Sequence, residues 1–87
     1  EAKKVLDASP FAEYQGEGLG HGVGLFLHEL PFLQSSCTTT LEENMVITIE
    51  PGIYIPGWGG IRIEDDIRVT AQGSEMLTHA PRALISI

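Results

Sequence analysis

The chain has 87 residues, a size that allows at most one small domain with a thin core. Twelve acidic residues against five basic ones give a net charge of -7, which would repel a phosphate backbone and disfavours nucleic acid as a partner. No apolar run approaches the length of a membrane span, and the amino terminus lacks a secretory signal pattern. The single cysteine, Cys37, excludes an internal disulfide and suits a reducing compartment. We therefore expect a soluble, cytoplasmic protein without membrane contact.

The first third of the sequence predicts a helix followed by an extended segment. Residues 1–8 are typical of the last turns of a helix, which a Ser-Pro pair stops. Because this helix begins at the first residue without a cap, we expect the chain to be a piece of a longer one. Residues 19–28 predict an extended segment that bends or bulges at its glycines. Pro31 is expected to end this element, and residues 34–40 are expected to form a surface loop.

The second half predicts strands that pair antiparallel. Its segments are rich in β-branched residues and are separated by Pro-Gly and Gly-rich turns, of which residues 56–60 supply a tight reversal. The expected strands are residues 45–50, 53–55, 61–70 and 75–78. The tail that runs to Ile87 is apolar enough to pack against another part of the protein.

Glycine recurs at every second position from Gly16 to Gly24, in a stretch that also holds His21 and His28. If this stretch is extended, all five glycines share one face and leave it bare, so that a backbone, a ligand or a metal can come close. The spacing does not match the dinucleotide fingerprint, because no pair has the third glycine three places on. The stretch therefore predicts a site rather than scaffold.

Carboxylates on the predicted strands are candidate metal ligands. Alternation puts Thr48 and Glu50 on one face of the first strand, and Arg62, Glu64 and Asp66 on one face of the return strand. Glu50 ends an apolar strand directly before Pro-Gly, and Glu64 follows an apolar residue. A carboxylate in such surroundings is costly unless a cation pairs with it. The alternative is that both are ordinary solvated charges.

The two histidines are seven residues apart, which sets their relation to a metal ion. A straight strand points His21 and His28 to opposite faces, and a helix places them two turns apart. We expect one of them to bind the ion and the other to support the ligand or contact substrate. A core histidine that only packs is the alternative. Mixed imidazole and carboxylate ligands suit Mn, Co, Zn or Fe(II), which favours metal-assisted hydrolysis.

Three motifs in combination resemble the pita-bread metallopeptidases, the family of Xaa-Pro dipeptidases, aminopeptidase P and methionine aminopeptidase. They are GHGVGLFLHELP, ENMVITIEPGIYIPGWGG and IRIEDDIRVT. The sequences of these motifs resemble the proline-specific branch more than methionine aminopeptidase. The resemblance implies an α+β fold, with a curved antiparallel sheet backed by helices. It also implies that residues 1–87 are the carboxy-terminal part of a single catalytic domain whose amino-terminal half is missing here.

The resemblance implies roles for individual residues. His21, Glu50 and Glu64 are implied as metal ligands, of which Glu64 bridges two ions and Glu50 also serves as the proton shuttle. His28 is implied to hydrogen-bond the substrate or the tetrahedral intermediate. Two further positions match residues that support the site, Arg62 and Tyr54. Glu17 departs from the pattern, because many proline-specific relatives have a histidine there, and this change bears on how the substrate is held.

The resemblance further implies two divalent ions, with Mn favoured among Mn, Co, Zn and Fe, and a peptide substrate with proline at its second position. Two aspartates from earlier strands would complete a set of five protein ligands, so this piece alone should bind metal weakly and catalyse little. Its expected partners are the missing half of the domain and a second copy of the chain. Two other functions stay open. One is a pita-bread binding module without catalysis, and the other is a metal-independent, creatinase-like hydrolase in which His28 transfers the proton.

Overall fold

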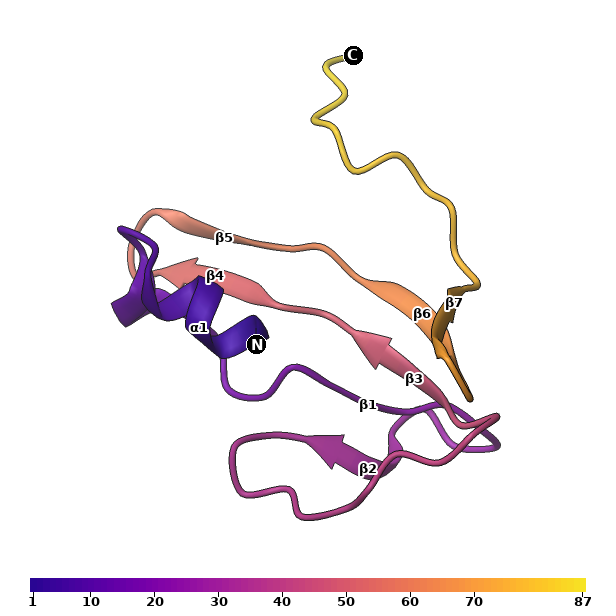
Figure 1. Ribbon diagram of the computed structural model, residues 1–87. Coiled ribbons are helices and arrows are strands. Elements are labelled where there is room, and N and C mark those ends of the chain that lie inside the picture. The colour runs from indigo at the N-terminus through magenta and orange to yellow at the C-terminus, as the bar shows by residue number, and fades with distance from the viewer.

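The computed structural model describes residues 1–87, and antiparallel strands make up most of its regular structure (Figure 1). Helices are few and short: α1 (Ala2–Asp7) and a single 3-10 turn, η1 (Ala12–Tyr14). The strands, in chain order, are β1 (Gly20–Gly22), β2 (Glu29–Leu33), β3 (Val46–Ile49), β4 (Gly52–Ile55), β5 (Gly59–Arg62), β6 (Asp65–Thr70) and β7 (Gly73–Met76). Five strands form one sheet in the order β2-β1-β3-β6-β7, and β4 and β5 form a second. The predicted antiparallel pairing of the second half is confirmed.

The two strand pairs β3–β6 and β4–β5 run on from each other as one long hairpin (Figure 1). They share one register, because Ile49 pairs with Asp65 and Gly52 pairs with Arg62. The single return strand expected for residues 61–70 is wrong in one respect, since the ladder is interrupted between β5 and β6. The shared register puts Pro51 opposite this gap, and proline has no N–H to donate to a ladder.

The glycine-rich segment is extended over only part of its length, and it has the bend and the bulge that its glycines predict. Only β1 is a strand, and residues 23–28 bend before β2 returns antiparallel along β1. The prediction that Pro31 ends the element is wrong, because Pro31 lies inside β2. β2 is the outermost strand of its sheet and its register with β1 shifts after His21, a place where the missing N–H of a proline is tolerated.

The face that the glycines leave bare is occupied by neighbouring backbone. A Cβ at Gly20 would collide with the carbonyl oxygen of Thr48, and one at Gly22 would collide with that of Leu30. The sequence left open whether a backbone, a ligand or a metal approaches this face. At Gly20 and Gly22 it is another backbone. The glycines let β1 lie closer to β2 and β3 than any side chain would permit.

The helix and the tail are attached by polar contacts rather than by an apolar core. Gln15, which bridges to Ile53 of β4, donates a side-chain hydrogen bond to Asp7 of α1 at 2.8 Å. Together with the Lys3 ammonium group, this hydrogen bond lowers the pKa of the Asp7 carboxyl. Ile47 is the one fully buried large apolar side chain.

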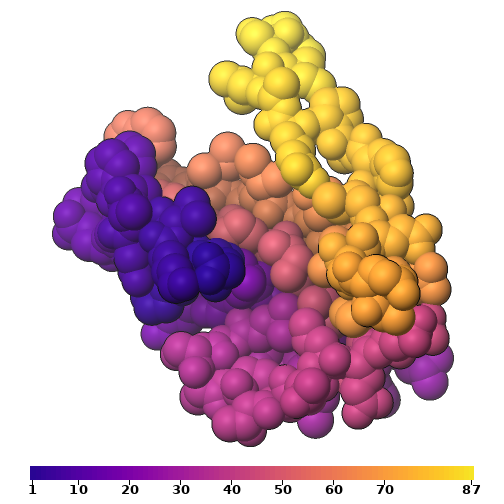
Figure 2. Space-filling model, in the orientation of Figure 1, coloured from indigo at the N-terminus to yellow at the C-terminus, as the bar shows by residue number.

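The carboxy-terminal tail leaves β7 and projects from the body of the molecule (Figure 2). Arg82 forms an ion pair with Asp65 at 2.7 Å, which ties the start of the tail to β6. Within these 87 residues the last part of the tail packs against nothing, since Leu84 is 95% exposed and Ile87 is fully exposed, so its packing stays a prediction. No helix in the structure has the length and apolarity needed to cross a membrane.

Candidate metal centre

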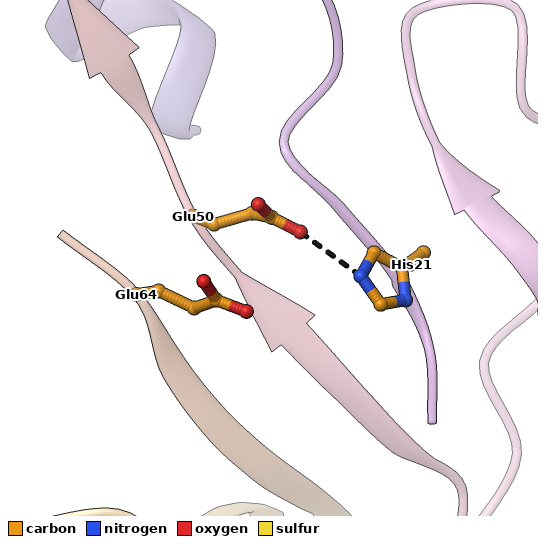
Figure 3. Close-up of side chains that lie close together, drawn as sticks. All are labelled: His21, Glu50 and Glu64. Atoms are coloured by element: carbon orange, nitrogen blue, oxygen red, sulfur yellow. Dashed lines mark ion pairs between the residues drawn. The ribbon is translucent and has the colours of Figure 1, made fainter. Parts of the chain in front are cut away.

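Three potential metal ligands from separate elements converge at one point (Figure 3). His21 is the central residue of β1, Glu50 directly follows β3, and Glu64 lies in the gap between β5 and β6. One ligand atom from each lies within 4.8 Å of the others. The structure thus brings together the three residues that the sequence predicts as ligands.

The hairpin register explains why the two carboxylates meet. Because Ile49 pairs with Asp65 and Gly52 pairs with Arg62, Glu64 falls opposite Glu50. Directly opposed side chains on antiparallel strands lie close together, and like charges there repel. The Glu50 side chain is only 15% exposed, so water screens this repulsion poorly. A cation between the two carboxylates would remove it.

The His21 ring is oriented so that one nitrogen faces the carboxylates. Its Nδ1 lies 2.8 Å from the carbonyl oxygen of Gly22, and a hydrogen bond there places the ring proton on Nδ1. Nε2 then presents a lone pair, 3.2 Å from the Oε1 atom of Glu50. Two acceptors face each other unless a proton or a metal ion lies between them. His21 is 12% exposed, so its ring has little freedom to turn away.

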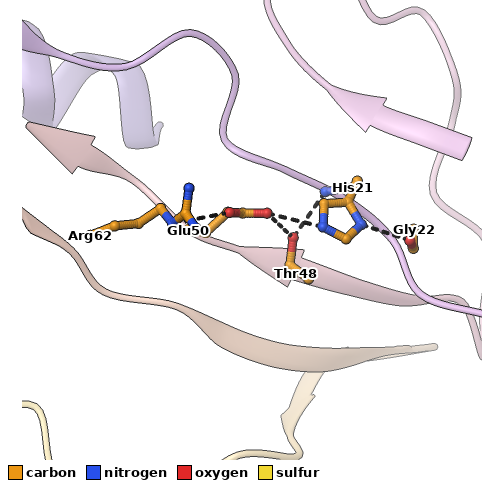
Figure 4. A network of polar contacts seen from close by, with 5 residues as sticks. All are labelled: His21, Gly22, Thr48, Glu50 and Arg62. Carbon is orange, nitrogen blue, oxygen red and sulfur yellow. Dashed lines mark hydrogen bonds and ion pairs between the residues drawn. The ribbon is translucent and has the colours of Figure 1, made fainter. Parts of the chain in front are cut away.

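A buried threonine connects the two ligands (Figure 4). The backbone N–H of His21 donates to Thr48 Oγ1 at 3.0 Å, and this hydroxyl donates to Glu50 Oε1 at 2.8 Å. Sequence reasoning did not include Thr48 in the site. The signal that could have found it was present, because alternation puts Thr48 and Glu50 on the same face.

Arg62 and Tyr54 both lie at the site. Arg62 Nε is 3.4 Å from Glu50 Oε2, and because the arginine is half exposed this ion pair contributes little by itself. Together with His21, Glu50 and Glu17, Arg62 and Tyr54 line an open cleft of about 370 Å³. Two of the three candidate ligands, His21 and Glu50, can therefore be reached from solvent through this cleft.

His28 lies beside this cluster but is not part of it. Its ring meets the His21 ring edge to face, with centroids 4.6 Å apart and planes at 68°. Neither the straight strand nor the helix considered from the sequence applies to the two histidines, because the segment between them bends. The Phe26 N–H donates to the Glu29 carboxylate at 3.2 Å within the bend, and this bend carries His28 back toward β1.

The residues present fit a divalent metal ion. One imidazole nitrogen and two carboxylates form a donor set suited to Mn, Co, Zn or Fe(II), and no thiolate lies among them. Three protein donors leave coordination positions open for further ligands and for water. The arrangement defines the kind of centre that metal-dependent hydrolases use.

The chain belongs to metallopeptidase family M24, whose family model matches residues 1–71. It is 51% identical over 84 residues to an Xaa-Pro dipeptidase of Pyrococcus horikoshii, covering 97% of this chain and 24% of the relative. The chain therefore spans about a quarter of the length of that relative.

Solved structures show the same fold. The Xaa-Pro dipeptidase from Bacillus anthracis matches with a TM-score of 0.90 and 49% identity, over 95% of this chain and 23% of that one. The X-Pro aminopeptidase from Thermotoga maritima matches with a TM-score of 0.89 and 44% identity, over 94% of this chain and 23% of that one. The expected fold is confirmed: the chain adopts part of the pita-bread fold.

Proposed function

We propose that residues 1–87 are the carboxy-terminal part of a single metallopeptidase domain, and that the full-length protein hydrolyses Xaa-Pro peptide bonds. The observation that carries this proposal is the convergence of His21, Glu50 and Glu64 within 4.8 Å, in a chain of family M24. The names of the relatives, an Xaa-Pro dipeptidase and an X-Pro aminopeptidase, support the choice of substrate.

The three converging residues would hold the metal, and Glu64 would be the ligand that two divalent ions share. We favour Mn among the metals that accept mixed imidazole and carboxylate ligands. When bound, such an ion supplies a Lewis acid that polarises a carbonyl group and acidifies water. Two further carboxylate ligands would come from the rest of the domain.

Glu50 is the residue we assign to proton transfer. Its Oε1 atom is held by Thr48, and its Oε2 atom faces the cleft side near Arg62. In this role the carboxylate accepts a proton from the attacking water and returns it to the departing amine as the C–N bond breaks. His28, exposed next to His21, would donate a hydrogen bond to the substrate, and Arg62 and Tyr54 would support the site from the cleft wall.

A Glu64→Gln substitution in the full-length protein tests the proposal. It keeps the side-chain size but removes the charge that opposes Glu50, so we expect hydrolysis of an Xaa-Pro dipeptide to fall at least about 100-fold. Calorimetric Mn²⁺ binding should weaken in parallel. The matched control is Glu43→Gln, an exposed position outside the cluster, which should leave both quantities unchanged.

Full activity of the Glu64→Gln variant would contradict the assignment. Hydrolysis that survives exhaustive metal removal would instead favour the metal-independent mechanism with His28 as the proton carrier. A wild-type protein without hydrolytic activity would favour the binding-module function. We also propose a cytoplasmic location, which the single cysteine favours, and a homodimer as the assembly to test first.

A further inference from the structure

We propose that Thr48 is a positioning residue of this centre, because its one hydroxyl holds both the Glu50 carboxylate and the backbone of His21 in the arrangement that receives a metal ion. The expected effect on metal binding rests on the proposed function, whereas the hydrogen bonds that support the proposal are all formed within these 87 residues. Thr48 is not expected to bind the metal itself, because threonine is not among the side chains that transition metals prefer.

The hydroxyl of Thr48 makes one donated and one accepted hydrogen bond, which together fix its direction. Thr48 is 2% exposed, so water does not compete for its hydroxyl. It accepts from the His21 N–H at 3.0 Å and donates to Glu50 Oε1 at 2.8 Å. A bond to an ionised carboxylate is stronger than one between neutral groups, particularly where water is excluded.

The bond to His21 replaces a backbone contact that the sheet does not provide. β1 pairs with β3 at a single position, Gly22 with Ile47, and its register with β2 shifts directly after His21. The His21 N–H is therefore satisfied by the Thr48 side chain. A loss of this bond would leave a partly buried N–H unpaired, next to the ring that has to point Nε2 at the carboxylates.

The bond to Glu50 selects one orientation of a flexible side chain. Arg62 attracts Glu50 Oε2 from the exposed side at 3.4 Å, whereas Thr48 anchors Oε1 from the buried side. With Oε1 anchored, this oxygen stays 3.2 Å from His21 Nε2. The same hydroxyl thus sets the spacing between two ligand atoms, one from β1 and one from the residue that follows β3.

Gly20 makes this arrangement possible. A Cβ at Gly20 would lie 2.8 Å from Thr48 Oγ1 and would collide with the Thr48 carbonyl. Only glycine allows β1 to approach closely enough for the His21 N–H to reach the hydroxyl. The branched Cβ of threonine also restricts its χ1 angle, which keeps the hydroxyl aimed at this position.

The test uses the full-length protein with Mn²⁺ as the probe. Thr48→Val keeps the branched shape and removes the hydroxyl, so we expect Mn²⁺ affinity to fall about 10- to 100-fold, as for other residues that orient metal ligands. Thr48→Ser keeps the hydroxyl and should bind Mn²⁺ nearly as tightly as the wild type. Thr70→Val at the end of β6 is the matched control and should bind like the wild type.

A second readout does not depend on the metal. In the metal-free protein, amide hydrogen exchange at His21 should accelerate in Thr48→Val and stay slow in Thr48→Ser. If the valine variant does not fold, Thr48→Ala and Thr48→Ser carry the comparison, because they differ by one hydroxyl. The alanine variant should then show the weaker Mn²⁺ affinity and the faster His21 exchange.

Equal Mn²⁺ affinity and equal His21 exchange in the hydroxyl-bearing and hydroxyl-free variants would overturn the proposal. A loss of thermal stability that valine and serine share, without a difference in Mn²⁺ affinity, would also overturn it, because it would show a purely structural role. A wild-type protein that binds no Mn²⁺ would overturn the proposed function instead. In that case the His21 exchange rates alone decide whether Thr48 positions this strand.

Discussion

Single atoms decide the geometry of this centre, and Gly20 is the plainest case. A Gly20→Ala substitution in the full-length protein adds one methyl group where the Thr48 carbonyl already lies. We expect it to cost about 1–3 kcal/mol of stability, because β1 and β3 must separate to make room. The melting temperature should fall clearly, and Mn²⁺ affinity should fall with it.

The control for that substitution is Gly57→Asn. Gly57 has a φ angle of 75°, which asparagine tolerates better than most residues, and no atom lies within 4 Å of its added Cβ. This variant should melt close to the wild type. A Gly20→Ala protein that melts as high as Gly57→Asn would show that the two strands can move apart freely.

Contacts between individual side chains were the hardest feature to predict from the sequence. Glu50 and Glu64 could be predicted as a pair, because alternation and a hairpin turn relate them through local rules. The contact between His21 and His28 could not, because it depends on a bend whose course is set by the Glu29 carboxylate and the Phe26 N–H. Alternation could have placed Thr48 beside Glu50, but its contact with the His21 N–H could not be predicted, because that contact depends on how closely β1 approaches β3.

At the scale of elements, the β-branched runs and glycine turns predicted the hairpin. Its interruption was not predicted and is explained by one proline. Pro51 cannot donate to the ladder, and the gap opposite it holds Glu64. Because of this interruption, Glu64 lies outside the ladder, where it is one of the candidate metal ligands. Pro31 shows the opposite case: a residue expected to end a strand lies within β2, because the bulge between β1 and β2 tolerates it.

The tail is a separate element whose attachment is open to test. Arg82 pairs with the largely buried Asp65, and Thr78 Oγ1 donates to the same carboxylate at 2.9 Å. Arg82→Ala should free the tail and speed hydrogen exchange at the Leu77 amide, which donates to the Asp66 carbonyl. Because Arg82 is half exposed, the expected loss of stability is below about 1 kcal/mol.

The matched control for Arg82 is Lys3→Ala, which breaks an exposed ion pair within α1. It should leave exchange at Leu77 unchanged. Unchanged exchange in the Arg82→Ala protein would mean that Thr78 and the β6–β7 ladder hold the tail without the ion pair.

The whole molecule exposes more surface than a compact protein of its size. Its accessible area is 6885 Å², against roughly 5,000 Å² expected for a compact monomer of this mass. Its radius of gyration is 14.1 Å, against about 12 Å expected. Five of 87 residues are buried, while Leu25, Leu27 and Trp58 are among the large apolar side chains that are mostly exposed. The strands alone do not enclose a core.

This surplus surface predicts how the 87-residue chain behaves by itself. β2 and β7 are the two edge strands of the sheet, each paired on one side only, and exposed edges next to apolar side chains favour pairing with other chains. On gel filtration we expect the isolated chain to elute as an oligomer or aggregate and to bind Mn²⁺ far more weakly than the full-length protein. A folded monomer with a cooperative melting transition would contradict this expectation. It would show that the few buried residues around Ile47 suffice, and that the remainder of the domain is needed for ligands rather than for folding.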